Sequence, residues 1–507
     1  MDQIRLAAAH VEGVEGFLVE VEVSRSQPST GTGRTTVVGL PDAAVRESID
    51  RMTPALFASG LSHRPGDHLV INLAPAGRRK EGPAFDLAIA LGLAATMREN
   101  QLPTLPADTA FVAELALDGT LRPARGVLAC AIAARAAGLT RLVVAPVNAA
   151  EAAVVDGIAV HAPANLAECC RWLRAGIEHA PRRSAGAEVE TTLDSLDLID
   201  VRGQEHAKRA LITAAAGGHN LLMIGPPGSG KTMLARRLPG LLPGLTLEEA
   251  LDVTRVHSCA GMLPDGRGLM RQRPFRAPHH SVSPVGLIGG GSYPKPGEVS
   301  LAHHGVLFLD ELPEFPRLVL EMLRQPLEDG HLTISRGGGR LRFPARCMLV
   351  AAMNPCPCGY LGHPTRRCTD GADFVHRYRS RISGPLLDRI DIHLEVPFQR
   401  PDIQAAPAGA TTAQARDQVA TARTRMLDRQ GCANAVLDAR GLKKHLQADD
   451  AGLRLLTQAV DELGLSARAY DRICKVARSI ADLDGRERVT LEDLSEAIGY
   501  RVLDRPA

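Results

Sequence analysis

The chain has 507 residues, a formal net charge of +2 and only 3% aromatic residues. This length predicts about three domains, and the balanced charge excludes a globally basic nucleic-acid-binding chain, so any such contact must come from local clusters. No apolar run reaches the length of a membrane span, no signal-peptide pattern opens the chain, and ten scattered cysteines favour a reducing cytoplasm over a disulfide framework.

Residues 1–175 predict a mixed α and β domain. The alternating run 17–23 is typical of a strand with one solvated face, and the strongly apolar run 85–97 of a buried helix. Asp118 and Gly119 separate two short apolar runs, which predicts a hairpin with a two-residue turn. Further strands are expected at 35–41, 68–73 and 141–145, and further helices at 43–60 and 129–138.

Two stretches of this block, 80–90 and 114–123, resemble the ribosomal-S5-domain-2-like fold of the Lon protease domain. In that protease a serine follows Gly-Pro and a lysine follows the hairpin shortly after. Here Ala84 and Leu128 stand at these positions, and neither can act as a nucleophile or a base. The resemblance therefore implies an α+β domain without the catalytic dyad and argues against peptidase activity.

Small and polar residues indicate two boundaries. Residues 176–196 predict a linker, and a stretch rich in Ala, Thr and Gln near 401–415 precedes a helical remainder. In that remainder Thr490 is expected to cap the last helix, with Asp493 three residues later completing a capping box.

Residues 225–232, Gly-Pro-Pro-Gly-Ser-Gly-Lys-Thr, match the phosphate-binding P-loop. The run 220–224 predicts a buried strand before it and 233–238 a helix after it, which is the setting that the motif requires. The glycines let backbone amides face phosphates, while Lys231 can reach the β- and γ-phosphates and Thr232 can ligate Mg²⁺. A glycine-rich turn that matches by chance is the alternative. The candidate nucleotide-binding residues are Gly225, Pro226, Pro227, Gly228, Ser229, Gly230, Lys231 and Thr232.

Two further apolar runs end in polar residues. The run 305–309 is followed by Asp310 and Glu311, and 346–353 is followed by Asn354. Ligands of open α/β sheets bind at the carboxyl ends of buried parallel strands. Asp310 is therefore expected to hold Mg²⁺ beside ATP and Glu311 to orient the attacking water, with Asn354 positioning the same water beside the γ-phosphate.

An insertion at 271–297, rich in Gly, Pro, Arg and His, separates these motifs. A loop of this length inside a compact domain is usually functional, although a surface excursion is the alternative. The adjacent pairs His279–His280 and His303–His304 lack the helical spacing of zinc enzymes, which favours polar contacts over a metal site.

Residues 331–343 predict a β-hairpin with glycines at its tip. Its arginines Arg336, Arg340 and Arg342 are candidates for contact with a phosphate backbone. An ordinary solvated hairpin is the alternative.

Cys356, Cys358 and Cys368 lie close together in the sequence. With His363 or Asp370 as a fourth ligand they could bind Zn²⁺. Free thiols are the alternative.

Three arginines resemble those that complete the site in AAA+ ATPases. The segment around Arg389 is similar to the arginine finger of the magnesium-chelatase and MCM branch, which implies that Arg389 enters a neighbouring subunit's site and stabilises the transferring phosphoryl group. Arg381 is a second candidate, and an ion pair with Asp388 or Asp391 is the alternative role of either. Arg468 matches the sensor-2 arginine of AAA+ lids. A segment similar to the one beside the adenine in these ATPases contains Gly203, Gln204, Ala207, Lys208 and Ala210.

Over essentially its whole length the chain resembles the YifB/ComM family of magnesium-chelatase-like AAA+ ATPases. The most specific matches are 276–280, 307–315, 353–359 and 378–389. The departure is Asp370, where the family carries a fourth cysteine. The resemblance implies an α/β AAA+ P-loop core at 197–400 and a helical lid domain at 401–507.

Family membership also implies a function. It predicts a cytoplasmic homo-hexamer that uses ATP and Mg²⁺, binds single-stranded or branched DNA and does not bind membranes. For the competence members it implies a helicase that drives branch migration during natural transformation and homologous recombination. A protein-remodelling ATPase and the motor subunit of a metal chelatase remain alternatives, and stimulation of ATP hydrolysis by DNA would distinguish them.

Overall fold

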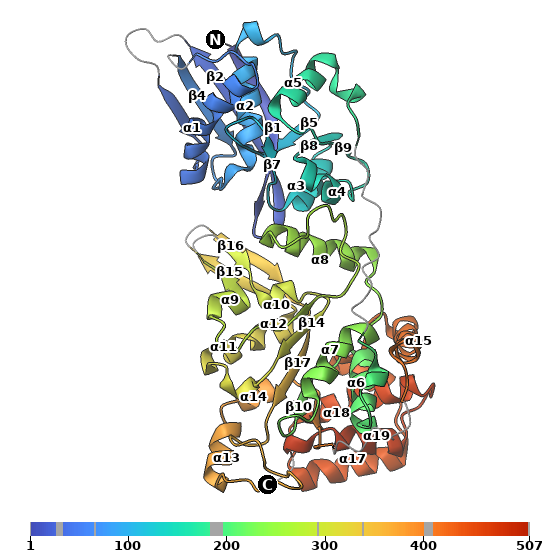
Figure 1. Ribbon diagram of the computed structural model, residues 1–507. Coiled ribbons are helices and arrows are strands. Elements are labelled where there is room, and N and C mark those ends of the chain that lie inside the picture. The colour runs from blue at the N-terminus through green and yellow to red at the C-terminus, as the bar shows by residue number, and fades with distance from the viewer. Residues whose placement is uncertain are drawn as a thin grey trace. The chain divides into compact units, whose positions relative to one another are not determined.

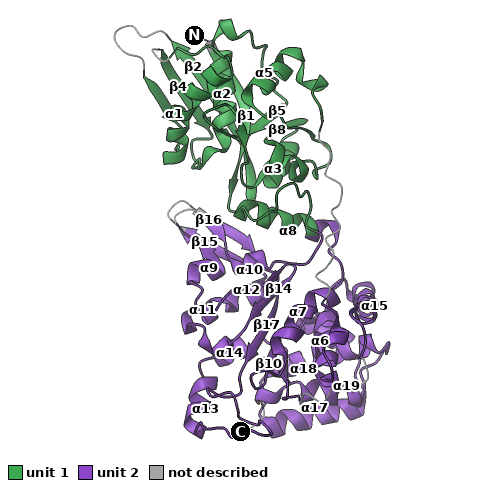
Figure 2. Ribbon diagram, viewed as in Figure 1, with its two compact units in different colours: residues 1–190, 250–270 green, residues 191–249, 271–507 purple. Residues whose placement is uncertain are grey.

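The computed structural model describes residues 2–26, 34–64, 67–182, 196–291, 294–336, 339–399 and 409–504. The chain forms two compact units, one of residues 1–190 with 250–270 and one of residues 191–249 with 271–507 (Figure 2). No helix among the described ranges has the length and apolar character needed to cross a membrane.

The first unit is built on a seven-stranded mixed sheet (Figure 1). The alternation expected at 17–23 is confirmed, since Val19, Val21 and Val23 are fully buried. The first strand was not predicted, yet it pairs antiparallel with the second along its whole length, from Asp2–Arg25 to Glu12–Glu15. In spatial order the strands are β3 (Thr35–Val38), β4 (His68–Ala74), β2 (Glu15–Ser26), β1 (Asp2–Glu12), β5 (Thr109–Val112), β8 (Arg141–Val144) and β9 (Ala159–His161).

Helix α2 (Asp86–Ala95) is buried around its circumference, as its unbroken apolar sequence predicts. The expected hairpin also forms, between β6 (Glu114–Leu115) and β7 (Leu121–Arg122), but its connection is longer than the two-residue turn expected, because the innermost hydrogen bond joins Ala116 to Thr120. Ala84 and Leu128, at the two positions compared with the protease dyad, lie in one buried apolar cluster. The other helices of this part are α1 (Ala43–Ala58), α3 (Val127–Ala136), α4 (Ala149–Ala152) and α5 (Leu166–Ala175).

Most of helix α8 (Leu247–Ala260) belongs to this first unit although it follows the P-loop in sequence. Ser258 donates to Glu151 Oε2 at 2.6 Å and its carbonyl accepts the amide of Gly126 at 3.2 Å. Arg255 pairs with Glu15 at 3.3 Å. Part of the expected linker is also structured, because Ile177 and Ala180 are buried in the core of this unit, whereas 183–195 lie outside the described residues.

A five-stranded, all-parallel sheet forms the centre of the second unit (Figure 1). Its three central strands are entirely buried, which explains their continuous apolar sequences. In spatial order the strands are β11 (Phe275–Arg276), β14 (Val306–Leu309), β17 (Met348–Met353), β10 (Leu221–Ile224) and β18 (Ile392–Glu395). The P-loop strand therefore lies between the strands that come fourth and fifth in sequence.

Helices surround this sheet, and two short hairpins extend the segment between β11 and β17. The hairpins are β12 (Gly289–Gly290) with β13 (Lys295–Pro296), and β15 (His331–Arg336) with β16 (Gly339–Pro344). The helices are α6 (Glu205–Gly217), α7 (Lys231–Leu241), α9 (Pro284–Ile288), α10 (Glu298–Leu301), α11 (Arg317–Met322), α12 (Arg324–Asp329), α13 (Ala372–Arg379), α14 (Gly384–Leu387), α15 (Thr412–Gln430), α16 (Ala439–His445), α17 (Asp450–Leu463), α18 (Ala467–Leu483) and α19 (Leu491–Gly499).

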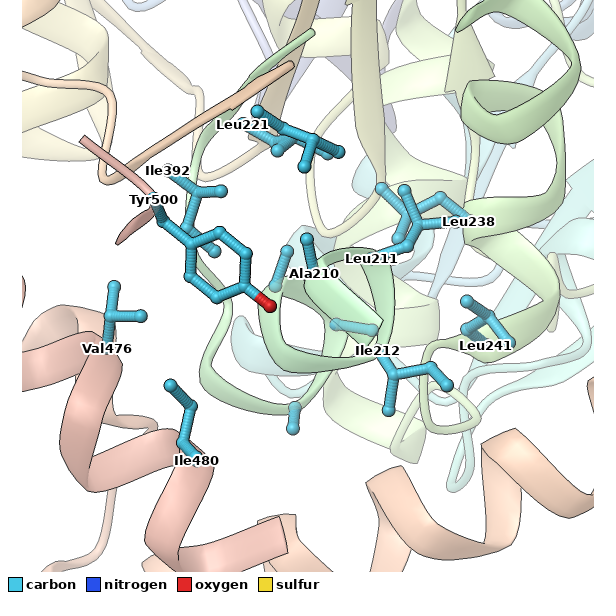
Figure 3. Close-up of a cluster of buried hydrophobic side chains, with 14 of the residues drawn as sticks. Ala210, Leu211, Ile212, Leu221, Leu238, Leu241, Ile392, Val476, Ile480 and Tyr500 are labelled. Carbon is cyan, nitrogen blue, oxygen red and sulfur yellow. The ribbon is translucent and has the colours of Figure 1, made fainter. Parts of the chain in front are cut away.

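The carboxyl-terminal helices share one hydrophobic core with the sheet. Figure 3 shows Tyr500 surrounded by side chains of both parts, among them Ala210, Ile392, Val476 and Ile480. A separate lid domain was expected at 401–507, and its described part, residues 409–504, is included in the same compact unit as the sheet. The capping box of α19 forms as predicted, with Thr490 and Asp493 each accepting the other's backbone amide.

A buried polar network joins the same two parts. Asp391, which precedes β18, contacts Nδ1 of His219 at 3.3 Å and pairs with Arg472 of α18. His219 Nε2 lies 2.8 Å from Ser479 Oγ of α18. Burial by itself would raise the pKa of Asp391, but Arg472 and His219 outweigh it and lower that pKa well below its usual range. The network therefore ties α18 to the residues that immediately precede β10 and β18.

Candidate nucleotide-binding site

The P-loop connects β10 to α7 in the strand–loop–helix setting that the sequence predicts. Gly228 and Gly230 have φ angles of 77° and 90°, a left-handed region that favours glycine. A Cβ atom on Gly225 would lie 2.1 Å from the carbonyl oxygen of Val396. The glycines of the motif are thus required by the backbone path as well as by the close approach of a phosphate.

Lys231 is folded over this loop. Its Nζ donates to the carbonyl oxygens of Gly225 at 2.7 Å and Pro226 at 3.0 Å, and lies 3.5 Å from Oδ1 of Asn354. Burial lowers the pKa of Lys231, and Asp310 opposes that shift. A phosphate in the loop would give this ammonium group stronger, charge-assisted hydrogen bonds than the carbonyls do.

Thr232 and Asp310 meet where α7 begins and β14 ends. The Thr232 hydroxyl donates to Asp310 Oδ2 at 2.8 Å, so a hydroxyl and a carboxylate oxygen stand side by side, a combination that suits Mg²⁺. The amide of Glu311 donates to the other oxygen of Asp310 at 3.0 Å. Glu311 itself has φ 53°, a left-handed conformation that is uncommon for a non-glycine residue.

The Glu311 side chain has a partner that the nucleotide-binding motifs do not predict. Nδ1 of His280 lies 3.3 Å from Glu311 Oε2, and the His280 ring packs against Phe315 and the ring of His279. The polar role expected for this histidine is thus confirmed. The signal in the sequence was its position in a glycine- and proline-rich insertion between the two nucleotide motifs.

Gln204 also contacts the P-loop. Its amide nitrogen donates to the carbonyl of Ser229 at 3.3 Å and to that of Pro397 at 2.9 Å. It therefore links the segment expected beside the adenine to the loop and to the chain after β18.

Each of the three candidate arginines forms an ion pair with a carboxylate of its own chain. Arg389 donates to the carbonyls of Pro385 at 2.7 Å and Arg324 at 3.1 Å and pairs with Glu328. The partner is thus neither of the aspartates that the sequence suggested. Arg381 pairs with Glu314 at 3.1 Å and Arg468 with Asp388 at 3.8 Å; their side chains are 53% and 66% exposed, against 12% for Arg389.

The hairpin of β15 and β16 presents two of its three arginines to solvent. Arg340 and Arg342 are exposed and, two residues apart on one strand, share a face, while Leu332 and Phe343 are buried. Arg342 lies 3.1 Å from Nδ1 of His331. The side chain of Arg336 lies outside the described residues.

Cys356, Cys358 and Cys368 converge in the loop after β17. Asp370 joins them, with its carboxylate accepting the Cys358 amide at 2.7 Å. His363 is not among the clustered ligand atoms; its Nδ1 accepts the amides of the nearby residues 365 and 366.

Known proteins match nearly the whole chain. The family models described as magnesium chelatase, subunit ChlI, as subunit ChlI of Mg-chelatase, and as magnesium chelatase, subunit ChlI C-terminal, match residues 197–403, 19–148 and 409–501. The chain is 44% identical to the competence protein ComM of Haemophilus influenzae, over 97% of this chain and 96% of that one. It is 42% identical to the uncharacterized protein YifB of Salmonella typhimurium, over 99% and 98%. The magnesium-chelatase 38 kDa subunit of Rhodobacter capsulatus is 29% identical, over 30% of this chain and 48% of its own.

Proposed function

Because the chain belongs to the YifB/ComM family of magnesium-chelatase-like AAA+ ATPases, we propose that it is an ATP-driven DNA motor. In this proposal it is a helicase that promotes branch migration during natural transformation and homologous recombination, and it works as a homo-hexamer in the cytoplasm. The observation that carries the motor is the contact of Lys231, Thr232, Asp310 and Asn354 at one sheet edge.

The residues on this edge divide the work of hydrolysis. Lys231 would bind the β- and γ-phosphates, and Thr232 and Asp310 would hold Mg²⁺. Bound Mg²⁺ would neutralise charge that develops on the phosphates. Glu311 orients the attacking water and accepts its proton, and Asn354, 3.5 Å from the Lys231 ammonium, positions that water beside the γ-phosphate.

His280 supports a resting arrangement of this site. Its contact with Glu311 keeps the carboxylate in one orientation, so that the carboxylate is not free to turn toward the attacking water. When Glu311 turns to the water it must leave His280, so this histidine is a positioning residue in the proposed cycle.

The arginine that completes the site comes from a neighbouring subunit. Arg389 fits this role by its segment, and its release from Glu328 would accompany assembly of the ring. A guanidinium at the transferring phosphoryl group would add to the charge stabilisation that Lys231 and Mg²⁺ supply from the P-loop side. Arg468, at the start of α18, is proposed to contact nucleotide on the same chain as the P-loop.

DNA as the substrate is supported by two observations. The ComM relative is named a competence protein, and the hairpin exposes Arg340 and Arg342 on one face. Paired cations on an extended strand can follow successive phosphates of a nucleic-acid backbone. In the ring, hydrolysis would move this hairpin along a strand of DNA.

A branch-migration assay on a three-stranded junction tests the proposal. We expect ATP-dependent strand exchange by the wild-type chain, stimulation of its ATPase by single-stranded or branched DNA, and neither with Lys231→Ala. If DNA does not stimulate ATP hydrolysis, and a protein substrate both stimulates it and becomes unfolded, the chain is instead a protein-remodelling ATPase. Stimulation by a porphyrin-metallating partner would support the motor subunit of a metal chelatase, to which the core match points.

A further inference from the structure

The connection between β17 and α13 is long and irregular. Residues 354–371 contain neither helix nor strand, although they begin at Asn354 of the nucleotide site. A loop of this length in a compact domain needs some other constraint to hold one conformation. Three cysteines and one aspartate from this loop come together at its centre.

The three sulfur atoms form a nearly equilateral triangle. Cys356 Sγ is 3.4 Å from Cys358 Sγ and 3.6 Å from Cys368 Sγ, and the last two are 3.6 Å apart. Tetrahedral zinc bound 2.3 Å from each sulfur would separate the sulfurs by about 3.8 Å. A disulfide would instead join one pair at about 2.05 Å and leave the third sulfur aside. Three nearly equal distances indicate ligands around a common centre.

Asp370 supplies the fourth position. Its Oδ2 lies 3.9 Å from Cys368 Sγ, and the four ligand atoms all lie within 4.8 Å of one another. The Cys358 amide donates to this carboxylate at 2.7 Å and orients it toward the sulfurs. Asp370 stands where the resembled family has a cysteine, and a carboxylate is also a zinc ligand.

Hydrogen bonds around the cluster fit a metal-thiolate site. The Leu361 amide lies 3.4 Å from Cys356 Sγ, a contact that stabilises a thiolate and fixes its direction. The same loop contains two cationic residues, Arg366 and Arg367. Soft sulfur ligands in tetrahedral array select zinc over calcium or magnesium.

The loop also contacts the P-loop. Gly359 adopts φ 83°, and a Cβ atom there would lie 2.8 Å from Cδ of Pro227 and 3.9 Å from Cγ of Asn354. The turn from Cys356 to Gly359, closed by a 3.0 Å hydrogen bond between their backbones, therefore rests on the nucleotide site.

We propose that Cys356, Cys358, Cys368 and Asp370 bind one structural Zn²⁺, which holds the loop against Pro227 and Asn354. All four positions around the ion are filled by protein, so the site is closed and does not activate water. The ion supplies the cross-link that the irregular loop lacks. Its loss frees the loop and weakens nucleotide binding without removing any residue that contacts ATP.

Metal analysis of the purified full-length chain tests this directly. We expect about one zinc per chain in the wild type after gel filtration, loss of that zinc in Cys358→Ser and in Cys368→Ser, and retention in Asp370→Cys, which restores four thiolates. Cys432→Ser changes a cysteine outside the cluster and should keep the zinc. In the zinc-loaded wild type, the three cluster thiols should resist a thiol reagent until a chelator is added.

Two further readouts separate the outcomes. Substitution with Co²⁺ should give the thiolate-to-metal absorption of a tetrahedral sulfur site in the wild type and in Cys432→Ser. Chelation should weaken ATP binding about tenfold while Cys432→Ser binds as before. A zinc-free wild type from zinc-supplemented cells, with all three thiols reactive before chelation, would overturn the site; unchanged ATP affinity after zinc removal would overturn its coupling to the P-loop.

Discussion

The P-loop edge and the arginine-bearing segments of the second unit present their polar residues differently. At the edge, Lys231 lies within hydrogen-bonding distance of Asn354, and Thr232 donates to Asp310; all four residues are assigned to the proposed nucleotide and its Mg²⁺. Arg389 and Arg468 instead pair with carboxylates of their own chain, Glu328 and Asp388. If the proposed roles hold, one chain thus brings together the residues assigned to the phosphates and Mg²⁺, whereas Arg389 and Arg468 must leave these carboxylates before they can contact a phosphate.

Removing the P-loop cation should have the largest effect. Lys231→Ala takes away the ammonium group that is folded over the loop, and we expect no measurable ATP binding by calorimetry because charge-assisted hydrogen bonds to the phosphates are lost. Arg236→Ala removes an exposed cation from the same helix and should bind ATP as the wild type does. Equal losses in the two variants would show that general charge, not the P-loop contact, governs binding.

Glu311→Gln tests whether Glu311 activates the attacking water. The variant keeps the shape of the side chain but cannot accept a proton, so we expect wild-type ATP affinity and turnover lower by about 10⁴-fold. Steady-state hydrolysis and equilibrium binding on the same preparation check both parts. Turnover at the wild-type rate would refute the role assigned to Glu311.

Arg389→Ala and Glu328→Gln together test the other half of the comparison. An arginine that reaches a neighbour's phosphate should, when removed, lower turnover by about 10³-fold at unchanged ATP affinity. Removing its carboxylate partner should leave turnover intact or raise it, because the guanidinium is then freer to move. If the pair only fastens α12 to the segment before β18, the two variants will instead lose thermal stability and turnover to the same extent.

The hairpin should give a smaller and more selective effect. Arg340→Ala and Arg342→Ala should each weaken single-stranded DNA binding and reduce the dependence of log Kd on log salt by about 1, with basal ATP hydrolysis unchanged. Fluorescence anisotropy at several salt concentrations measures this. A loss of affinity with no change in salt dependence would exclude contact between these arginines and phosphates.

The last effect is on folding and not on activity, and it concerns pH and the network that joins α18 to the sheet. The folded state lowers the pKa of Asp391, so its stabilising contribution is full above the unfolded pKa and is lost as pH falls through the folded one. We expect Asp391→Asn to unfold about 3 kcal/mol more easily at pH 7, with the difference from the wild type shrinking at acidic pH in calorimetry. Asp388→Asn, on a more exposed ion pair, should differ little at either pH; a loss for Asp391→Asn that is independent of pH would contradict this account.

Local sequence predicted most elements that carry the site. The P-loop, the buried strands and the positions of Asp310 and Asn354 follow from motifs and apolar runs, which encode short-range geometry. The strand 2–12 was missed because its central alanines carry no strong strand preference, and pairing with β2 decides its conformation. The contacts of Arg389 with Glu328 and of His280 with Glu311 join residues distant in sequence, and no spacing rule encodes them.

The assignment of residues 250–270 to the first unit was also beyond local patterns. Helix α8 has an ordinary amphipathic sequence, and its residue Ser258 is bound by Glu151 and Gly126, which precede Ser258 by more than a hundred residues. In the same way Asp370 departs from the family pattern in sequence, yet its carboxylate still lies beside the three sulfurs.

A mixing experiment tests most directly whether the site is shared between subunits. Lys231→Ala lacks the P-loop half and Arg389→Ala lacks the arginine half, so each should be inactive alone as an ATPase. When the two are combined and allowed to assemble, some interfaces join an intact P-loop to an intact Arg389, and we predict that ATP hydrolysis returns in proportion to those interfaces. A mixture that stays as inactive as its components, while the wild-type chain assembled in the same way hydrolyses ATP, would contradict a site shared between subunits.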